Sequence, residues 1–499
     1  MPADRAPISL DLARGPIDFH IIGVGGANMN SIAAVLAAMG HRVSGSDQNA
    51  SAVLERLHAQ GVRTFVGHDA AHVVGAGAVA YSAAVAEGNV ELAAARELGI
   101  PVLTRAEVLS AICRSRRALA VSGTHGKTTT TAMLAAILVE AGSDPAYLVG
   151  GELVGGRGGA HWGGGAWLVV EADESDGTFL HLGAEGVVVT SVEADHLDHY
   201  GDLGTLEAAF VRFVAEAPGP RVVCLDDPGA ARVVASLAVQ GYGDLSPLVT
   251  YGTSAGVTYR AGRVCLGATS AGFELEARGR LLGRFQLKVP GLYNVRNATA
   301  AVAMALEVGA SPEAAWAALA SYRGVGRRFE LRGVHEGVTY VDDYAHNPGK
   351  VRAVLAAARD GGWERVVAVF QPHRYTRTAA LWRELGEAAS RADLLFVTGV
   401  YPAGEAPLPG VSGRLVADAA RAARPSLCVE YIEPRPELAL ALRRALRPGD
   451  LCLTMSAGDL TTLPDDLLAG PVRGDPPMGS LDSDPPRGTA SSTRARSPQ

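Results

Sequence analysis

The chain has 499 residues, of which 48% are hydrophobic and 19% charged, and its formal net charge is −7 at pH 7. This length exceeds what one core usually organises and predicts about three domains. An acidic balance argues against a general nucleic-acid binder, which needs a basic face. No uncharged apolar run reaches the roughly 18 residues that a membrane-spanning helix needs, so we expect neither nucleic acid nor membrane as a partner.

Cysteine usage and the N-terminus predict a cytoplasmic location. The five cysteines are scattered, without CxxC spacing, which is typical of reduced thiols and not of a disulfide framework or a zinc knuckle. The opening stretch "MPADRAPISLDLARGPIDF" contains acids and prolines where a secretory signal needs a continuous apolar core.

The first segment follows the pattern of a nucleotide-binding α/β fold. "IDFHIIGVGG" predicts a strand and a glycine turn, "NSIAAVLAAMG" a helix, and "HRVSGSD" a second strand. The turn contains Gly23, Gly25 and Gly26, and Asp47 ends the second strand, as in a Rossmann-like fold. Because Asn28 stands where the third glycine of GxGxxG is expected, NAD(P), another nucleotide and a purely structural turn all stay open.

A second segment begins near residue 116 with a strand, a loop and a helix, in "RALAVSGTHGKTTTTAML". The loop resembles a P-loop, although Val121 stands where the first glycine of GxxxxGK[ST] belongs. Gly123 and Gly126 allow the backbone to approach phosphates, Lys127 would contact the β- and γ-phosphates, and Thr128 would bind Mg²⁺. The chain has only three lysines, which makes an accidental lysine in this loop implausible.

Acidic clusters follow two further predicted strands of this segment. They comprise Glu171, Asp173, Glu174 and Asp176, and then Glu193, Asp195, His196 and Asp198. The carboxyl ends of parallel strands gather ligands, and Mg²⁺ prefers carboxylate oxygens. These acids are therefore candidates for a metal site, with solvated loop acids as the alternative.

Two polar pairs precede the third segment. In "GLYNVRNATAAVAMAL", Asn294 and Asn297 could read a nucleotide base, or Asn297 could cap the helix. In "YRGVGRRFELRG", Arg327 and Arg328 lie at the junction of two segments, where an arginine fork suits phosphate recognition and a solvated pair is the alternative.

The third segment, from about residue 330, again alternates predicted strands and helices, which indicates another parallel sheet. "FQPHRYTRT" brings His373, Arg374 and Arg377 together after a strand, where arginines could hold a carboxylate or simply form a surface loop. From about Gly474 the chain is rich in Pro, Ser and Gly, which predicts a disordered tail.

Eight ordered motifs give the chain a resemblance to the Mur ligase family, between about Ile17 and Leu468. They are "GTHGKTTTT", "EADESDGTFLHL", "VEADHLDHYGD", "GLYNVRNATAAVA", "GVGRRFE", "DDYAHNP", "FQPHRYTRT" and "YPAGEAPLPGVSG". The resemblance implies an α/β fold of three domains, with Rossmann-like N- and C-terminal domains around a central P-loop ATP-binding domain. The implied divisions are residues 1–115 for the UDP-sugar, 116–328 for ATP and 329–472 for the amino acid, followed by a disordered tail at 473–499.

The reaction that the resemblance implies joins L-alanine to the lactyl carboxylate of UDP-N-acetylmuramate in peptidoglycan precursor synthesis. ATP phosphorylates the carboxylate, and the amine of alanine then attacks the acyl phosphate. The implied cofactors are ATP and Mg²⁺ or Mn²⁺, and the implied assembly is a monomer or homodimer.

The resemblance also implies roles for individual residues. Those implied to bind ATP are Gly123, Thr124, His125, Gly126, Lys127, Thr128, Thr129, Asn294, Asn297, Arg327 and Asp343. Those implied to bind the metal are Thr128, Glu171 (in preference to Glu174) and His196. Those implied to act in catalysis are Lys127, His196, His346 and Arg374. The amino acid would be held by His373, Arg374 and Arg377, and the UDP-sugar by Gly23, Gly25, Gly26, Asp47 and Ser82.

The chain departs from the family pattern at several positions. Asn28 and Asn30 replace small residues in the first glycine turn, Asn347 stands where a second histidine is common, and Ser456 replaces a glycine. No lysine lies between residues 128 and 287, so the carbamylated lysine that several later-acting family members use has no counterpart there.

Three alternatives stay open at this point. A recycling ligase of the same family attaches a whole tripeptide to the same sugar, and sequence does not size the pocket. An NAD-dependent dehydrogenase would leave the P-loop and both acidic clusters without a role. An inactive binding protein would not need Lys127, Thr128, Glu171 and His196 together.

Overall fold

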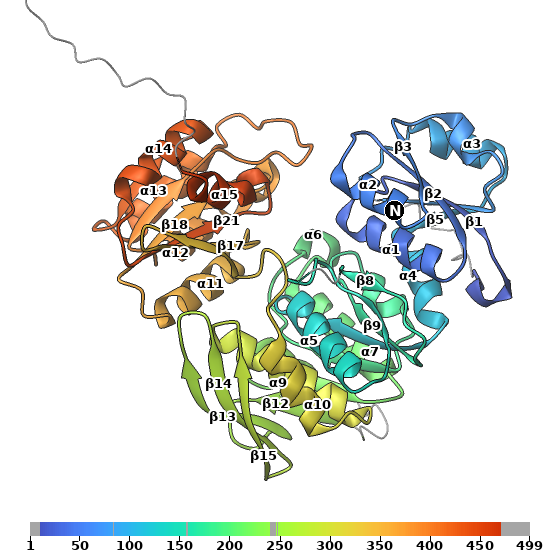
Figure 1. Cartoon of the computed structure of the whole chain (residues 1–499), viewed down its shortest axis with the longest axis horizontal. Coiled ribbons are helices and arrows are strands. Elements are labelled where there is room, and N and C mark those ends of the chain that lie inside the picture. The colour runs from blue at the N-terminus through green and yellow to red at the C-terminus, as the bar shows by residue number, and fades with distance from the viewer. Residues whose placement is uncertain (1–9, 83, 156–157, 240–245, 247, 471–499) are drawn as a thin grey trace, which may run out of the picture.

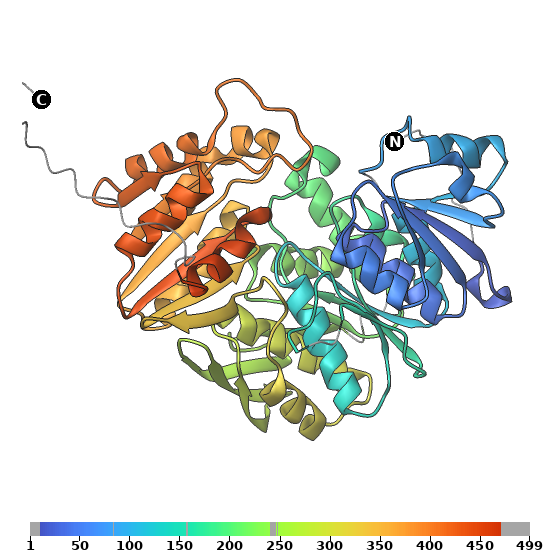
Figure 2. The ribbon, with the colours of Figure 1, turned by 45° about the horizontal axis from the view of Figure 1, so that its top comes forward.

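The computed structural model describes residues 10–82, 84–155, 158–239, 246 and 248–470. The first nine residues and the tail predicted to be disordered lie outside this described part. The chain forms three α/β bodies, each built on its own sheet, which confirms the expected fold class. In Figures 1 and 2 the N-terminal and C-terminal bodies lie on either side above the central body.

The N-terminal body has a parallel sheet in the order β3-β2-β1-β4-β5. Its strands are β1 (Asp18–Ile22), β2 (Arg42–Asp47), β3 (Arg63–Val66), β4 (Ala78–Tyr81) and β5 (Val102–Thr104). Its helices are η1 (Leu12–Arg14), α1 (Ala27–Ala38), α2 (Ala52–Ala59), η2 (Ala70–Val73), α3 (Val90–Glu97) and α4 (Arg105–Arg114). This strand–helix alternation with parallel pairing is the Rossmann-like arrangement that the sequence predicts.

The central body is built on a sheet in the order β15-β14-β13-β12-β11-β10-β6-β9-β7-β8. Its strands are β6 (Arg117–Ser122), β7 (Ala146–Leu148), β8 (Ala160–His161), β9 (Trp167–Glu171), β10 (Gly186–Val189), β11 (Arg221–Cys224), β12 (Leu248–Gly252), β13 (Tyr259–Leu266), β14 (Ala271–Ala277) and β15 (Arg280–Leu287). Its helices are α5 (Lys127–Glu140), η3 (Thr178–His181), α6 (Leu197–Tyr200), α7 (Leu203–Glu216), α8 (Pro228–Val239), α9 (Leu292–Glu307) and α10 (Pro312–Ser321).

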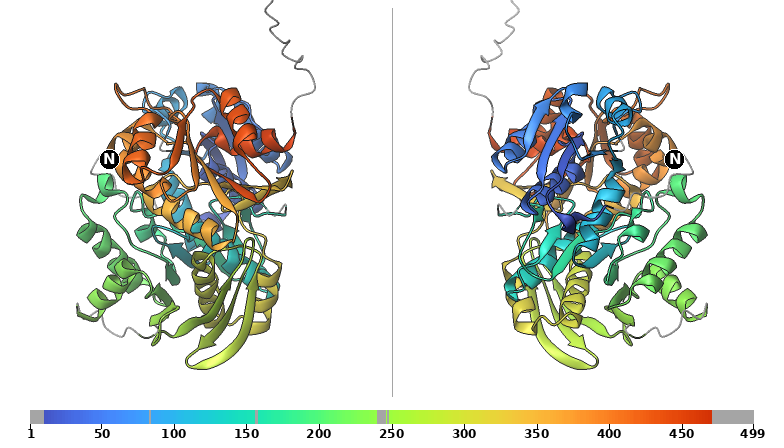
Figure 3. Two further views of the ribbon diagram at one scale, coloured as in Figure 1. Left: turned by 90° about the vertical axis from the view of Figure 1, so that its left-hand side faces the viewer. Right: turned by 90° about the vertical axis from the view of Figure 1, so that its right-hand side faces the viewer.

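The strands at the centre of this sheet are parallel and buried on both faces. Their sequences are therefore continuous apolar runs, such as "GVVV" in β10. Antiparallel strands β13–β15 extend the sheet at one side. They form the end of the molecule farthest from the other two bodies (Figure 3).

The C-terminal body has a sheet in the order β16-β17-β21-β18-β19-β20, parallel except for the β16–β17 hairpin. Its strands are β16 (Glu330–His335), β17 (Val338–Asp343), β18 (Arg365–Phe370), β19 (Leu394–Val397), β20 (Cys428–Tyr431) and β21 (Asp450–Met455). Its helices are α11 (Pro348–Asp360), α12 (Tyr375–Ala389), α13 (Gly413–Ala423), α14 (Arg435–Ala445), η4 (Asp459–Thr462) and α15 (Leu463–Leu468).

Hydrophobic packing joins the N-terminal and central bodies more extensively than it joins the C-terminal body to them. One continuous cluster of buried side chains runs from Leu12 in the N-terminal body to Val325 at the end of the central body. The buried members of two further clusters, which begin at Phe329 and Val338, belong to the C-terminal body. Tyr293 of α9 in the central body packs against the first of these two clusters. No helix in the described part of the chain is long and apolar enough to cross a membrane.

Candidate active site

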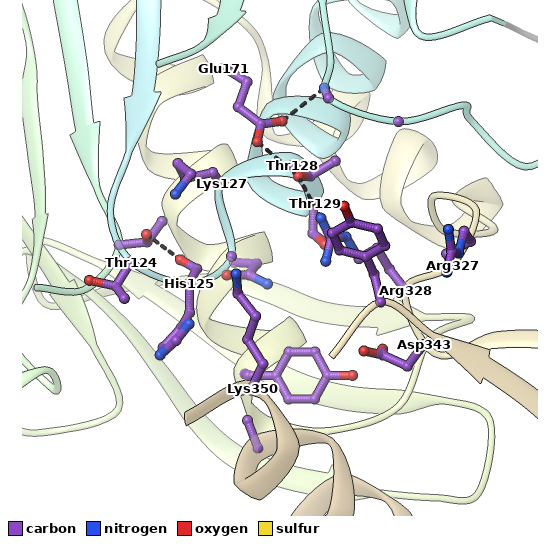
Figure 4. A pocket seen from close by; sticks show the side chains of 18 of the residues that line it. Thr124, His125, Lys127, Thr128, Thr129, Glu171, Arg327, Arg328, Asp343 and Lys350 are labelled. Atoms are coloured by element: carbon purple, nitrogen blue, oxygen red, sulfur yellow. Dashed lines mark hydrogen bonds between the residues drawn. The ribbon is translucent and has the colours of Figure 1, made fainter. Parts of the chain in front are cut away.

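A cleft of about 1280 Å³ lies where the three bodies meet. The P-loop and α9 of the central body form one side, and the first turn of α11 in the C-terminal body faces them. Asn28 and Arg56 contribute from the N-terminal body. Figure 4 shows the side chains that converge on the P-loop from these elements.

The P-loop connects β6 to α5 through two glycines with positive φ, Gly123 at 131° and Gly126 at 80°. A Cβ on Gly123 would overlap the hydroxyl of Thr190, and a Cβ on Gly126 would overlap the amide oxygen of Asn297. Glycine is therefore required at both positions by conformation and by space. The loop ends at the N-terminus of a 14-residue helix, where free N–H groups and the helix dipole favour an anion.

Lys127 is paired with a buried carboxylate. Its Nζ donates to both carboxylate oxygens of Glu174, at 2.9 and 2.8 Å, and to the carbonyl of Gly123 at 2.7 Å. Glu174 is only 1% exposed, and its charge is among the causes that keep the pKa of Lys127 raised despite burial. The sequence did not single out Glu174 for this role.

Glu171 occupies a different position, at the end of β9. Its carboxylate accepts hydrogen bonds from the hydroxyl of Thr128 at 3.0 Å and from the backbone N–H of Gly150 at 2.8 Å. Glu171 lines the cleft together with Thr128 and His196. This placement supports Glu171 over Glu174 as the acid that faces a metal, because Glu174 is occupied by Lys127.

His196, the third predicted metal ligand, lies near Glu174, the partner of Lys127. Its Nε2 is 3.9 Å from Glu174 Oε1 and 3.8 Å from Asp195 Oδ2. Among the described residues no three His, Cys, Asp or Glu side chains are grouped closely enough to hold a metal by themselves. A hydroxyl and one carboxylate beside a phosphate loop are a donor set that suits Mg²⁺, which keeps waters and phosphate oxygens as its other ligands. The side chain of Asp198 lies outside the described part.

The two predicted adenine contacts occupy different environments. Asn297 lines the cleft, whereas Asn294 is buried and donates to the carbonyl of Pro290 at 2.7 Å. Both lie within α9, whose N-cap is Gly291, so the alternative that Asn297 caps this helix is wrong. The helix begins at Leu292, directly after Gly291, whose φ of 93° is a conformation that glycine adopts readily.

The two arginines at the junction contact different bodies. The guanidinium of Arg327 turns into the C-terminal body, where Nη2 donates to the carbonyl of Ser456 at 2.6 Å. Arg328 turns the other way, and its Nη2 donates to the hydroxyl of Thr128 at 3.3 Å. Both guanidinium groups lie about 5 Å from the ring centroid of Tyr344, which holds the pair in place. Arg328 is therefore the arginine directed at the P-loop, although the family resemblance points to Arg327.

Asp343 closes this junction from β17. Its carboxylate accepts the backbone N–H groups of Phe329 at 2.7 Å and Ala345 at 2.8 Å. Burial raises the pKa of Asp343 to about 6. Asp343 therefore braces the chain where it crosses between the bodies, and it also lines the cleft.

The residues predicted to hold the amino acid cluster in the C-terminal body, behind the cleft wall. The rings of His346 and His373 are 5.8 Å apart, and Arg377 Nη1 lies 3.1 Å from His373 Nδ1. Burial lowers the pKa of His346 well below its ordinary value and lowers that of His373 to about 4. Arg374 also pairs with Glu405 at 2.6 Å, and its charge is among the causes that lower the pKa of His373.

Three residues with predicted roles have a left-handed backbone conformation. His196, Arg327 and Arg374 have positive φ values of 55°, 60° and 70°, a conformation that costs side-chain-bearing residues of order 1 kcal/mol or more. His196 and Arg374 are the N-cap residues of α6 and α12.

The predicted UDP-sugar residues meet at the carboxyl edge of the N-terminal sheet. Gly23, Gly25 and Gly26 form the turn into α1, and the carboxylate of Asp47 accepts the N–H of Gly25 at 3.0 Å. Ser82 follows β4, and its Cβ lies 3.3 Å from where a side chain on Gly23 would start. Their juxtaposition at one edge is as the parallel fold predicts.

Lys350 is a cleft residue to which sequence reasoning gave no role. It lies in the first turn of α11 and lines the cleft opposite the P-loop. The available signal was its rarity, since Lys127, Lys288 and Lys350 are the only lysines in the sequence.

Comparisons with known proteins agree with this geometry. Three family models match in order: "Mur ligase family, catalytic domain" at residues 18–117, "Mur ligase middle domain" at 168–305 and "Mur ligase, glutamate ligase domain" at 327–458. A protein of Myxococcus xanthus named UDP-N-acetylmuramate–L-alanine ligase is 43% identical over 464 residues, which cover 93% of this chain and 97% of that protein.

Two solved structures show the same three-body arrangement. The UDP-N-acetylmuramate–alanine ligase of Thermotoga maritima has a TM-score of 0.76 at 27% identity and covers 91% of this chain and 98% of its own. A murein peptide ligase of Psychrobacter arcticus has a TM-score of 0.66 at 24% identity over 91% of this chain and 98% of its own.

The chain belongs to the Mur ligase family. It is an ATP-dependent ligase that forms amide bonds, which excludes the dehydrogenase alternative.

Proposed function

We propose that this chain joins L-alanine to the lactyl carboxylate of UDP-N-acetylmuramate, with ATP converted to ADP and phosphate. The observation that carries the proposal is a P-loop cleft whose opposite wall belongs to the C-terminal body, the body that also carries a cluster of histidine and arginine. Relatives named for this reaction match nearly the whole chain, which supports the choice of substrates.

In the first step an oxygen of the lactyl carboxylate attacks the γ-phosphorus of ATP. The bond from that phosphorus to the β,γ-bridging oxygen breaks, and ADP leaves with the electron pair. In the second step the amine of alanine attacks the acyl carbon, and phosphate leaves with the electrons of the C–O bond while the amine loses a proton. Because two anions must approach in the first step, the site needs cations and fixed N–H donors between them.

The P-loop supplies these groups. Free N–H groups at the start of α5 cradle the β- and γ-phosphates, and Lys127 and Arg328 approach from opposite sides of Thr128. Bound Mg²⁺ or Mn²⁺, held by Thr128, Glu171 and His196, would neutralise phosphate charge. Asn297 lies beside Gly126 and is placed to contact the nucleotide, with Asn294 supporting it from behind.

In the cluster proposed to bind the amino acid, a neutral histidine can accept a proton and an arginine can hold a carboxylate. His346 Nδ1 lies 2.8 Å from the carbonyl of Tyr344 and must donate to it, which leaves Nε2 as the acceptor for an amine proton. A depressed pKa keeps this ring neutral at pH 7. Arg377, with Arg374 and His373 beside it, would hold the carboxylate of alanine.

The N-terminal sheet edge, with Gly23, Gly25, Gly26, Asp47 and Ser82, would hold the UDP part of the sugar. We also propose domain boundaries at 115/116, between α4 and β6, and at 328/329, just before β16. The cytoplasm, where these nucleotide substrates are made, is the location we propose, and a monomer or homodimer the assembly.

The experiment is phosphate release from ATP, Mg²⁺ and UDP-N-acetylmuramate, with L-alanine, with the tripeptide or with neither. Turnover with L-alanine alone supports the proposal, and turnover with the tripeptide alone would move the chain to the recycling branch. Lys127→Ala should abolish ADP formation while UDP-sugar binding, measured by calorimetry, stays near that of the wild type. Equal loss of both would contradict the assignment of Lys127 to ATP.

A further inference from the structure

Lys350 has no partner among the described residues, although it faces the most highly charged part of the cleft. Its backbone N–H donates to the side chain of Asn347, but its ammonium makes no hydrogen bond or ion pair there. In Figure 4 the side chain extends from α11 into the pocket, toward the N-terminus of α5. An unpaired ammonium in the cleft is a candidate to bind an anionic group of a ligand.

The acids near Lys350 are already engaged. Both carboxylate oxygens of Glu174 accept from Lys127. Asp195 accepts from the amide of Asn347 at 3.0 Å and from the backbone N–H of His196 at 3.0 Å. Neither acid therefore makes a direct contact with the Lys350 ammonium.

The other cations nearby make an unpaired ammonium still less favourable. Lys127 and Arg328 face Lys350 from the central body and the junction. Burial, followed by the charges of these two residues, lowers the pKa of Lys350 to about 8. Three cations converge on one part of the pocket, and one of them, Lys350, has no ion-pair partner among the described residues, which favours an anion between them.

We propose that Lys350 contacts the γ-phosphate of ATP and follows it onto the acyl phosphate, as a cation that the C-terminal body delivers to the reaction. This proposal rests on the ligase function proposed above. Lys127 and the P-loop hold the β- and γ-phosphates from the central body, whereas Lys350 comes from the opposite wall. The role of Lys350 is electrostatic: it stabilises charge on the transferring phosphoryl group and forms no covalent bond.

Two features position Lys350 for this contact. Asn347 caps α11 by accepting the N–H of Lys350 at 2.9 Å, which fixes the first turn of the helix. Gly349 lets that turn approach the P-loop closely, since a Cβ there would lie 2.7 Å from His125 Nε2. Lys350 therefore reaches the pocket only when the C-terminal body is seated on the central one.

The test compares the binding of MgATP and MgADP to the full-length protein by titration calorimetry. Lys350→Met should weaken MgATP binding by about tenfold or more, the usual worth of a charge-assisted hydrogen bond, while MgADP binding stays within about twofold. Lys288→Met is the matched control, because it removes the same charge from an exposed position away from the cleft. It should change neither affinity.

Equal weakening of both nucleotides by Lys350→Met, or of neither, would overturn the proposal. Lys350→Arg should recover most of the MgATP affinity, and Lys350→Gln provides a second neutral variant should the methionine variant fold poorly. Since the binding measurement needs neither sugar nor amino acid, it keeps its meaning if turnover with L-alanine fails.

Discussion

The amide of Asn347 in the C-terminal body donates a hydrogen bond of 3.0 Å to the carboxylate of Asp195 in the central body. The same side chain caps α11 through its oxygen. This polar contact joins the two bodies together with Tyr293 of α9, which packs against the apolar core of the C-terminal body. Asn347, which departs from the usual family residue, is thus a bridge across the cleft.

Asn347→Ser separates the two roles of this side chain. Serine still caps a helix but is too short to reach Asp195, so the free energy of unfolding should stay near that of the wild type while kcat falls by about tenfold, from the loss of a hydrogen bond to a charged group. Asn347→Ala should lose the same activity and also about 1 kcal/mol of stability with the cap. Steady-state kinetics and urea unfolding check both. A serine variant with wild-type kcat would show that the bridge does not matter for turnover.

Gly349→Ala should stabilise the C-terminal body and slow the enzyme. Alanine favours the helix by up to about 1 kcal/mol over glycine, and φ at this position is not positive. Its Cβ would nevertheless lie 2.7 Å from His125 and 3.1 Å from Glu193, which keeps α11 from seating. Measured on one preparation, the free energy of unfolding should rise and kcat should fall. A parallel rise in both would contradict the close approach.

Glu171 and Glu174 should give opposite responses to amide substitution. Glu171→Gln should raise the Mg²⁺ concentration for half-maximal rate by about tenfold with little change in stability, because it removes a ligand charge. Glu174→Gln should lower the free energy of unfolding by about 3 kcal/mol, since it leaves Lys127 unpaired, without the same shift in Mg²⁺ requirement. Magnesium titrations and thermal melts of both variants check this. Reversed responses would make Glu174 the ligand.

ATP affinity should fall as pH rises through about 8, the pKa to which burial lowers Lys350. Below that pH the ammonium is charged and attracts the triphosphate, and above it the charge is lost. The stability of the protein without ATP should depend on pH in the opposite direction. Between pH values of about 8 and 10.5, Lys350 is deprotonated in the folded state but protonated in the unfolded state, so the free energy of unfolding rises with pH. The groups that set this balance are Lys127, Arg328, Asp195 and Glu174.

The pH dependence is checked by measuring MgATP dissociation constants from pH 7 to 9 for the wild type and Lys350→Met. The wild type should lose affinity across this range, and the variant should show a flatter profile. Identical profiles would show that another group titrates.

Local sequence was sufficient to predict the P-loop and the strands around it, because glycine turns and apolar runs have local causes, whereas the arrangement of the three domains came from the family resemblance. The antiparallel strands β13–β15 carried mixed patterns, such as the alternating burial of β13, and were not predicted. The sequence likewise carried no signal that Arg327 would contact the C-terminal body and Arg328 the P-loop, or that Arg327 would have a positive φ. The pairing of Lys127 with Glu174 joins residues 47 positions apart, so only the fold reveals it.

The measurement that tests the central claim most directly follows the lactyl carboxylate oxygen. UDP-N-acetylmuramate labelled with ¹⁸O in that carboxylate is incubated with ATP, Mg²⁺ and L-alanine, and the products are analysed by mass spectrometry. The account predicts an alanine amide of the sugar nucleotide together with inorganic phosphate that carries one ¹⁸O atom from the carboxylate. Unlabelled phosphate, or no amide with L-alanine, would contradict it.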